Sequence, residues 1–253
     1  MQELLSMNEL GMSCVLLNPC PNPQELIYYA MHRCYSEEPL IEQIARGDFK
    51  GWTEAKFGEA VVKHLLSGNR GHFGPLEEGH QFMFAVDGAV HNLVMQLRTH
   101  RIGISFDVQS QRYTSQNVID VALGKKPVEE VFYFRPIGYE YTNRQGKKYT
   151  VSKEIDNALK GKCIADCDFY RTLIEYEGWS EEHARDYLPQ GIRQHFTFSA
   201  NIRTLLHLDN VRNKLDVQME LRVLMRHINN IMSEQCPEIY AWQNTKSKRM
   251  LSA

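Results

Sequence analysis

One short stretch of the chain concentrates positive charge around a histidine. Arg98-Thr99-His100-Arg101 places two guanidinium groups and an imidazole within four consecutive residues. Because the planar guanidinium group matches the geometry of phosphate and carboxylate groups, this stretch is typical of an anion-binding site. The alternative is a solvated basic helix end, since positive side chains there complement the helix dipole. Spacing alone leaves both interpretations open.

A second polar stretch begins nine residues after Arg101. Ser110-Gln111-Arg112-Tyr113 adds a hydroxyl, an amide and a third guanidinium group. A serine acts as a nucleophile only beside a base and an orienting acid, which this stretch lacks. It therefore indicates either a binding role or a polar turn before a strand.

The cysteines offer a further hypothesis, a zinc site. Cys163 and Cys167, together with His183, are of the residue types that bind zinc, but the second closely spaced pair of ligands is missing, so we expect no metal. Six cysteines in 253 residues are also too sparse for a disulfide framework, which indicates a reducing, cytoplasmic location.

Together the two polar stretches resemble the signature of the flavin-dependent thymidylate synthases, the thymidylate synthase complementing protein family. That signature reads Arg-His-Arg, seven residues and Ser, and it commonly continues Gly-Arg-Tyr. Here Thr99 replaces the first arginine, and eight residues separate Arg101 from Ser110. Four other segments resemble the family in the same order: Gly71-His72-Phe73-Gly74-Pro75-Leu76-Glu77, Ala184-Arg185-x-x-Leu188-Pro189, Asn201-Ile202-Arg203 followed by Arg212, and Gln235-Cys236-Pro237.

The resemblance implies a methyltransferase that converts deoxyuridine monophosphate (dUMP) to thymidylate (dTMP). In that family methylenetetrahydrofolate donates the carbon, and FAD that has been reduced by NADPH supplies the hydride. The family is homotetrameric, with sites shared between subunits. The expected partners are thus dUMP and folate, with neither nucleic acid nor membrane among them.

The resemblance also implies roles for individual residues. The expected FAD contacts are Thr99, His100, Arg101, Asp107, Asn201, Arg203 and His207. The expected nucleotide contacts are Gln96, Arg98, Ser110, Gln111, Arg112, Arg185 and Arg212. Arg212 and Ser110 are the candidate catalytic residues: Arg212 would stabilise negative charge developing on the uracil ring, because arginine stays protonated, and Ser110 would orient the substrate.

Other interpretations stay open. Arg203 and His207 are four residues apart on a predicted helix, so they can face one ligand or face water, and Arg212 can pair with Asp216 at the same spacing. The altered Thr99 leaves room for a flavin- or nucleotide-binding protein without catalysis. The arginine- and aromatic-rich segment 98–113 would suit RNA or single-stranded DNA, but a formal net charge of −2 disfavours that.

The elements that must position these residues predict an α+β fold with a mixed or antiparallel sheet packed with helices. Helices are predicted at 23–34, 40–46, 53–67, 89–101, 152–175, 180–187, 201–210 and 214–232. Strands are predicted at 81–86, 131–134, 139–141, 149–151 and 196–198, with strands and turns throughout 105–149. We expect a single domain over 1–253 with a β-rich insert around 125–162. No apolar run approaches the ~20 residues that span a bilayer.

Overall fold

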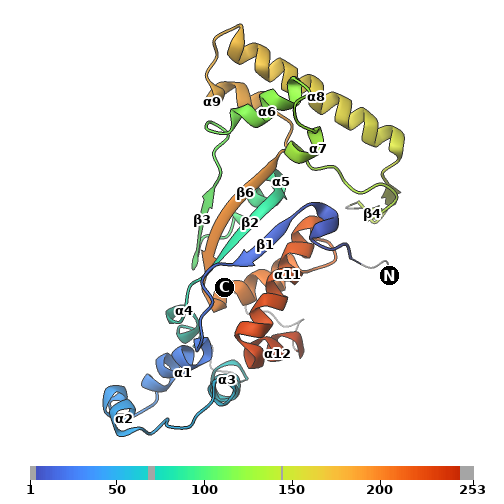
Figure 1. Cartoon of the computed structure of the whole chain (residues 1–253). Helices are drawn as coiled ribbons and strands as arrows, with labels where there is room; N and C mark the ends of the chain where they lie inside the picture. The colour runs from blue at the N-terminus through green and yellow to red at the C-terminus, as the bar shows by residue number, and fades with distance from the viewer. Residues whose placement is uncertain (1–3, 68–71, 144, 246–253) are drawn as a thin grey trace.

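The computed structural model describes residues 4–67, 72–143 and 145–245. A central sheet separates a helical base at one end from a helical arm at the other (Figure 1). The fold is α+β, as the sequence predicts. Among the described residues, no helix is both long and apolar enough to cross a membrane.

The central sheet has four strands in the order β1-β2-β6-β3, and every pairing is antiparallel. Its strands are β1 (Ser13–Leu16), β2 (Phe82–Val90), β3 (Ile104–Val108) and β6 (Arg193–Ala200). Side chains alternate between its faces, since Phe82 and Phe84 are fully buried whereas Met83 and Asp87 are exposed. The buried face shares one apolar core with α5 (His91–Leu97), α10 (Ile202–Arg212) and α11 (Met219–Gln235).

The helical base gathers segments from both ends of the chain (Figure 1). It holds α1 (Pro23–Arg33), α2 (Leu40–Arg46), α3 (Glu54–Val61), the π-helical continuation η2 (Val62–Leu66), α4 (Pro75–Glu78) and α12 (Pro237–Thr245), whereas η1 (Asn8–Leu10) lies at the other end of the sheet, near the arm. Thr53, the first residue of the helix predicted at 53–67, is the N-cap of α3, because its hydroxyl accepts a hydrogen bond from the Lys56 amide at 3.2 Å.

The helical arm has an apolar core of its own, which includes the fully buried Phe132, Cys167 and Tyr170. It consists of α6 (Ser115–Ala122), α7 (Val128–Val131), α8 (Lys153–Glu175), α9 (Glu181–Ala184) and η3 (Arg185–Tyr187). The hairpin of β4 (Glu140–Thr142) and β5 (Lys148–Thr150) lies between α7 and α8 in the chain. Segment 125–162 therefore contains the predicted hairpin, together with α7 and the first turns of α8.

Arg193 joins the arm to the sheet. Its Nη1 donates to the carbonyls of Leu10, Gly11 and Gly88 at 3.2, 3.0 and 2.7 Å, and its Nε donates to the carbonyl of Glu129 in α7 at 3.0 Å. Gly88 has a φ of +73°, and a Cβ there would lie 2.3 Å from the Gly11 oxygen. Only glycine allows this close approach.

Three predicted elements are wrong. Segment 105–149 was expected to hold only strands and turns, yet it contains α6 and α7. Segment 131–134 is not a strand: Val131 ends α7, and Phe132 makes an isolated bridge to Ile192. Residues 89 and 90 extend β2 rather than begin α5, because they pair with β6. In each case contacts with distant segments override the local preference. That the whole chain forms one domain stays a prediction.

Candidate functional site

Helices α5 and α10 meet through Arg212, the last residue of α10. Its Nε donates to His100 Nε2 at 3.0 Å, and its Nη2 donates to Thr99 Oγ1 at 3.1 Å and to the Gln96 carbonyl at 3.3 Å. Arg212 therefore binds the end of α5 rather than Asp216, which is exposed beyond the end of α10. The alternative of a simple pair between Arg212 and Asp216 is wrong.

His100 is held in its neutral form. Burial, followed by the nearby Arg212 guanidinium and the His207 ring, lowers its pKa to about 4. Its ring centroid lies 5.4 Å from that of His207. A neutral imidazole accepts a hydrogen bond at Nε2, which matches the donation from Arg212. Burial also lowers the pKa of Arg212, yet a guanidinium remains charged at neutral pH.

The start of α10 is fixed by Asn201. This residue is 3% exposed, and its Oδ1 accepts a hydrogen bond from the Thr204 amide at 2.9 Å. Its own amide donates to the Gly103 carbonyl at 3.1 Å. Gly103 has a φ of +65°, and a Cβ there would lie 2.4 Å from Asn201 Nδ2 and Thr204 Oγ1. Within this chain Asn201 is thus a helix cap that joins the turn after α5 to α10.

A cavity of about 430 Å³ lies between this turn, α10 and α4. Arg203 and His207 both line it, so they face one common space, and Arg203 forms an ion pair with Glu77. His207 Nδ1 is buried without a hydrogen-bond partner among the described residues, and a bound ligand would supply one. The lining residues are Glu77, Thr99, His100, Arg101, Ile102, Arg203, Thr204 and His207.

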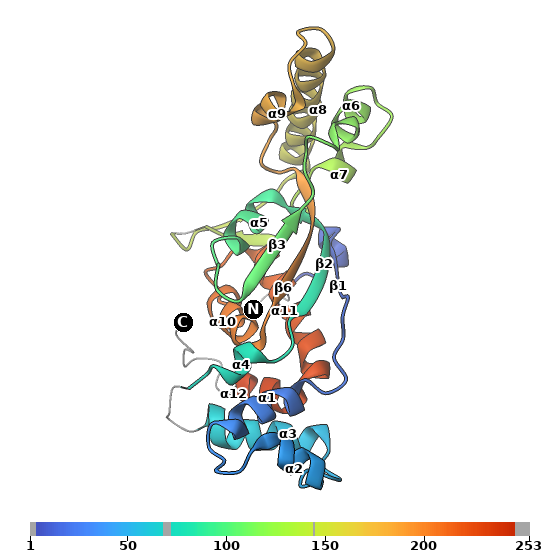
Figure 2. The same ribbon diagram turned by 90° about the vertical axis from the view of Figure 1, so that its left-hand side faces the viewer.

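The other predicted residues lie at the far end of β3. This strand runs from the level of α10 up to the arm (Figure 2), and its five residues span roughly 17 Å. Ser110 and Arg112 follow it. The Arg112 Nη1 atom lies 3.8 Å from Glu182 Oε1, with both side chains about half exposed, and Arg185 follows α9. The structure therefore divides the predicted residues into two groups, one at each end of β3.

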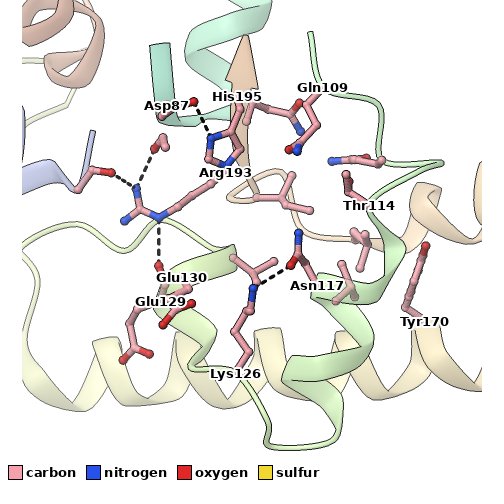
Figure 3. Close-up of a pocket in the computed structure, with 18 of the residues that line it drawn as sticks. Asp87, Gln109, Thr114, Asn117, Lys126, Glu129, Glu130, Tyr170, Arg193 and His195 are labelled. Atoms are coloured by element: carbon pink, nitrogen blue, oxygen red, sulfur yellow. Dashed lines mark hydrogen bonds and ion pairs between the residues drawn. The ribbon is translucent and has the colours of Figure 1, made fainter. Parts of the chain in front are cut away.

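A larger cavity of about 500 Å³ lies between the sheet and the arm (Figure 3), and Gln111 is the predicted residue that lines it. Its basic side chains are already engaged: Lys126 Nζ donates to Asn117 Oδ1 at 2.8 Å, and His195 Nδ1 lies 2.9 Å from Asp87 Oδ1. The Arg193 guanidinium is bonded to backbone carbonyls. This cavity thus offers less free positive charge to a phosphate than its size suggests.

Two predicted residues stand apart from both groups. Asp107 lies on the exposed face of β3, where it lines a separate cavity of about 330 Å³ with His195 and Thr197. Arg98 is exposed at the end of α5. Thr99 occupies the position of the first arginine of the family signature, and its hydroxyl accepts a hydrogen bond from Arg212.

Sequence reasoning missed three residues that contribute to this region. Glu77 pairs with Arg203, Thr204 Oγ1 donates to the Ile102 carbonyl at 2.9 Å, and Gln218 is hydrogen-bonded to Gln96. Glu77 belongs to one of the segments that resemble the family, so the sequence offered a way to find it. Nothing in the sequence pattern indicates the other two contacts, which join residues more than 100 positions apart.

The cysteines of the zinc hypothesis lie in the core of the arm. Burial raises the pKa of Cys163 to about 11 and that of Cys167 to about 12. Within the described ranges, no three or more His, Cys, Asp or Glu side chains are grouped as a metal site.

Comparisons with known proteins agree on one family. The family model described as thymidylate synthase complementing protein matches residues 15–238. A flavin-dependent thymidylate synthase from Haloarcula marismortui is 29% identical over 246 residues, covering 94% of this chain and 97% of the relative. One from Halobacterium salinarum is 27% identical, covering 92% and 95%.

Solved structures show the same fold. Thymidylate synthase X from Helicobacter pylori, determined with FAD and dUMP, superposes with a TM-score of 0.65 at 17% identity, covering 94% of this chain and all of that one. A UMP/dUMP methylase from Streptomyces cacaoi, bound with 5-Br dUMP, also gives a TM-score of 0.65, at 15% identity and with 92% and 95% coverage.

Proposed function

The chain belongs to the thymidylate synthase complementing protein family, the flavin-dependent thymidylate synthases, and we propose that it forms dTMP from dUMP at the site built around Arg212. The methyltransferase uses FAD, with methylenetetrahydrofolate as carbon donor and NADPH as reductant. The observation that carries the proposal is the network in which α10 and α5 hold Arg212 beside the 430 Å³ cavity.

The residues of that cavity fit a flavin nucleotide. Arg101, and the Arg203 nitrogens that are not bound to Glu77, offer N–H groups to a pyrophosphate, and the unpartnered His207 Nδ1 offers a further hydrogen-bonding position. Asn201 contributes by fixing the helix on which Arg203 and His207 stand. When bound, FAD supplies the hydride that reduces the transferred carbon to a methyl group.

Arg212 is positioned to activate the uracil ring. Its Nε and Nη2 are bound to α5, whereas Nη1 makes no hydrogen bond to the described residues and can reach a ligand. A fixed positive charge beside uracil stabilises the negative charge that develops when carbon 5 attacks the one-carbon unit. Because His100 is neutral, it accepts a hydrogen bond from Arg212 without repelling it.

The phosphate of dUMP requires cationic partners, and we assign Arg112 and Arg185 to it, with Ser110 and Gln111 beside them. These residues lie across the length of β3 from Arg212. Nucleotide contacts at both ends of β3 are compatible if the protein is a homotetramer, in which one subunit supplies Arg212 and another supplies Arg112. A cytoplasmic location accords with free access to such soluble substrates.

Mixing two inactive variants tests the shared site. Arg212→Ala and Arg112→Ala are each expected to form little dTMP, but subunits exchanged between them would produce some sites with both arginines intact. Recovery of activity after co-refolding supports the proposal. If the mixture stays inactive while a wild-type sample refolded in parallel recovers activity, each site takes both arginines from one chain.

The function itself is tested by colour and turnover. Purified protein should carry the flavin absorbance spectrum, oxidise NADPH faster when dUMP is added, and transfer radiolabelled carbon from methylenetetrahydrofolate to dUMP. A colourless protein that takes up no added FAD would overturn the proposal. Binding of FAD and dUMP without labelled dTMP would instead favour a non-catalytic binding protein, the alternative suggested by Thr99.

A further inference from the structure

A pair of side-chain amides links the candidate nucleotide site to α11. Gln96 Nε2 donates to Gln218 Oε1 at 2.5 Å, between residues 122 positions apart. The backbone carbonyl of Gln96 also accepts hydrogen bonds from Thr99 Oγ1 at 2.7 Å and from Arg212 Nη2 at 3.3 Å. Both the backbone and the side chain of Gln96 are therefore held in place.

Gln218 occupies a position where glutamine is a poor choice for helix formation. It is the N-cap of α11, and its carbonyl accepts hydrogen bonds from the amides of Leu221 and Arg222 at 3.1 Å each. Ser, Thr, Asp and Asn are preferred at N-caps because their short side chains bond to the first helical amides. The Gln218 side chain makes no such bond. It is directed to Gln96 instead.

The first turn of α11 gives Gln218 a rigid base. Glu220 is 1% exposed and lies 3.5 Å from Arg135 Nε, and Leu221 is fully buried. A side chain that extends from such a fixed turn can hold its partner in a single orientation. Gln218 is thus suited to fix the Gln96 amide before a ligand arrives.

We propose that Gln218 is a positioning residue, which orients the Gln96 amide toward the uracil ring of the nucleotide. The inference rests on the proposed function, in which Gln96 contacts dUMP. With one N–H donated to Gln218, Gln96 keeps a second N–H and a carbonyl oxygen. A neutral donor and acceptor side by side match the polar edge of uracil, whereas the charged phosphate is better served by arginines.

The test separates positioning from stability by means of the N-cap. Gln218→Ser removes the bond to Gln96 but introduces a preferred capping residue, so the melting temperature should stay equal or rise. The KM for dUMP and the Kd of dUMP for the FAD-loaded protein, measured by calorimetry, should increase about fivefold, as expected for one lost neutral hydrogen bond. The kcat should change little, because orientation in the ground state is what is lost.

Two further variants complete the design. Gln235→Ala is the matched control, since Gln235 stands at the other end of α11 and its Oε1 accepts a hydrogen bond from the Cys20 amide at 3.0 Å. It should lower the melting temperature and leave the Kd of dUMP unchanged. In the double variant Gln96→Ala with Gln218→Ser, the two effects on the Kd should not add, because each removes the same oriented amide.

The outcomes are distinct. The inference is supported if Gln218→Ser raises the Kd of dUMP without lowering the melting temperature, and if its effect on the Kd does not add to that of Gln96→Ala. An unchanged Kd for Gln218→Ser, with a weakened one for Gln96→Ala, overturns the inference and leaves the proposed function intact. If Gln96→Ala also binds dUMP as the wild type does, the inference is overturned. If the wild-type protein takes up neither FAD nor dUMP, the proposed function fails together with the inference.

Discussion

The two ends of β3 differ in how much of a binding site the chain builds by itself. At the α10 end, Arg212 makes three hydrogen bonds to α5 and its following turn, and Asn201 fixes the start of the helix. At the arm end, Arg112 is half exposed and lies 3.8 Å from a single carboxylate, that of Glu182. One end is organised before any ligand binds, whereas the other keeps its guanidinium group free to adapt.

This difference fits the tasks that we assign to the two ends. A charge that stabilises a transition state must already be in place, because reorganisation during the reaction would raise the barrier. A charge that captures a phosphate can become ordered on binding, at the cost of some affinity. Loss of the Arg212 charge should therefore act mainly on kcat, disruption of the Asn201 contacts mainly on stability, and loss of the Arg112 charge at the arm end mainly on KM.

The largest effect is expected for Arg212→Ala. Removal of one preorganised charged donor typically lowers kcat by about 10²- to 10³-fold, and the flavin spectrum should persist because the cavity residues remain. Single-turnover formation of dTMP measures this loss. Arg46→Ala, which breaks the exposed ion pairs of Arg46 with Glu38 and Asp48, is the control and should retain full turnover. If Arg212→Ala raised only KM, the two ends would not differ as we infer.

A second test disrupts the turn at the start of α10 without changing a charged residue. In Gly103→Ala the new Cβ meets Asn201 and Thr204 at 2.4 Å and enforces a left-handed backbone, so unfolding should cost about 3 kcal/mol less. Gly124→Ala is the matched control, since Gly124 has a similar φ of +67° but an added Cβ would meet nothing within 4 Å. It should lower the free energy of unfolding by about 1 kcal/mol. Urea unfolding at pH 7 measures both. Equal losses of stability in the two variants would show that backbone strain, and not the contact with Asn201, causes the destabilisation.

The sequence predicted the elements whose signals are local. Helices α1, α2 and α8 were predicted within a residue at each end, because caps and periodic apolar residues mark them. Helix α6 was missed, since its short apolar face becomes evident only when it packs against α8 in the arm. The strand expected at 131–134 contains strong β-formers, but Phe132 is buried in the core of the arm and pairs with Ile192 at only one position.

The candidate site was likewise predictable only in part. The resemblance supplied His100, Arg203, His207 and Arg212, and these residues gather around one cavity and its adjoining network. It could not supply the relation between Gln96 and Gln218, because a hydrogen bond across 122 positions leaves no pattern in a single sequence. Nor could it show that Thr99 meets Arg212 while Arg98 is exposed, since adjacent residues at a helix end point in different directions.

A smaller effect is expected in the pH dependence of stability, which tests whether the α10 end holds His100 neutral. Its pKa is lowered from 6.5 to about 4, so between these values the unfolded chain binds a proton that the folded protein does not. Stability should therefore fall as the pH drops from 6.5 to 4, by at most about 1.4 kcal/mol per pH unit, and by less because the ring is half-buried. Above pH 6.5 the contribution is constant.

The variant His100→Asn should flatten this dependence. Denaturant unfolding of the flavin-free protein at several pH values would reveal a shallower slope than in the wild type, confined to the window from 4 to 6.5. His64→Asn, which changes an exposed histidine in η2, is the control and should keep the wild-type slope. Parallel curves for wild type and His100→Asn would mean that the α10 end does not hold His100 neutral.

The smallest effect is expected at the arm end, with Glu182→Gln. An exposed pair at 3.8 Å contributes little, so the free energy of unfolding should change by less than about 0.5 kcal/mol. The lost carboxylate no longer competes with phosphate for Arg112, so KM for dUMP should fall by about twofold at low salt, and less at high salt. Glu177→Gln, a nearby exposed carboxylate, is the control. A change in stability larger than the change in KM would mean that Arg112 is already held in place, and the two ends of β3 would then be organised alike.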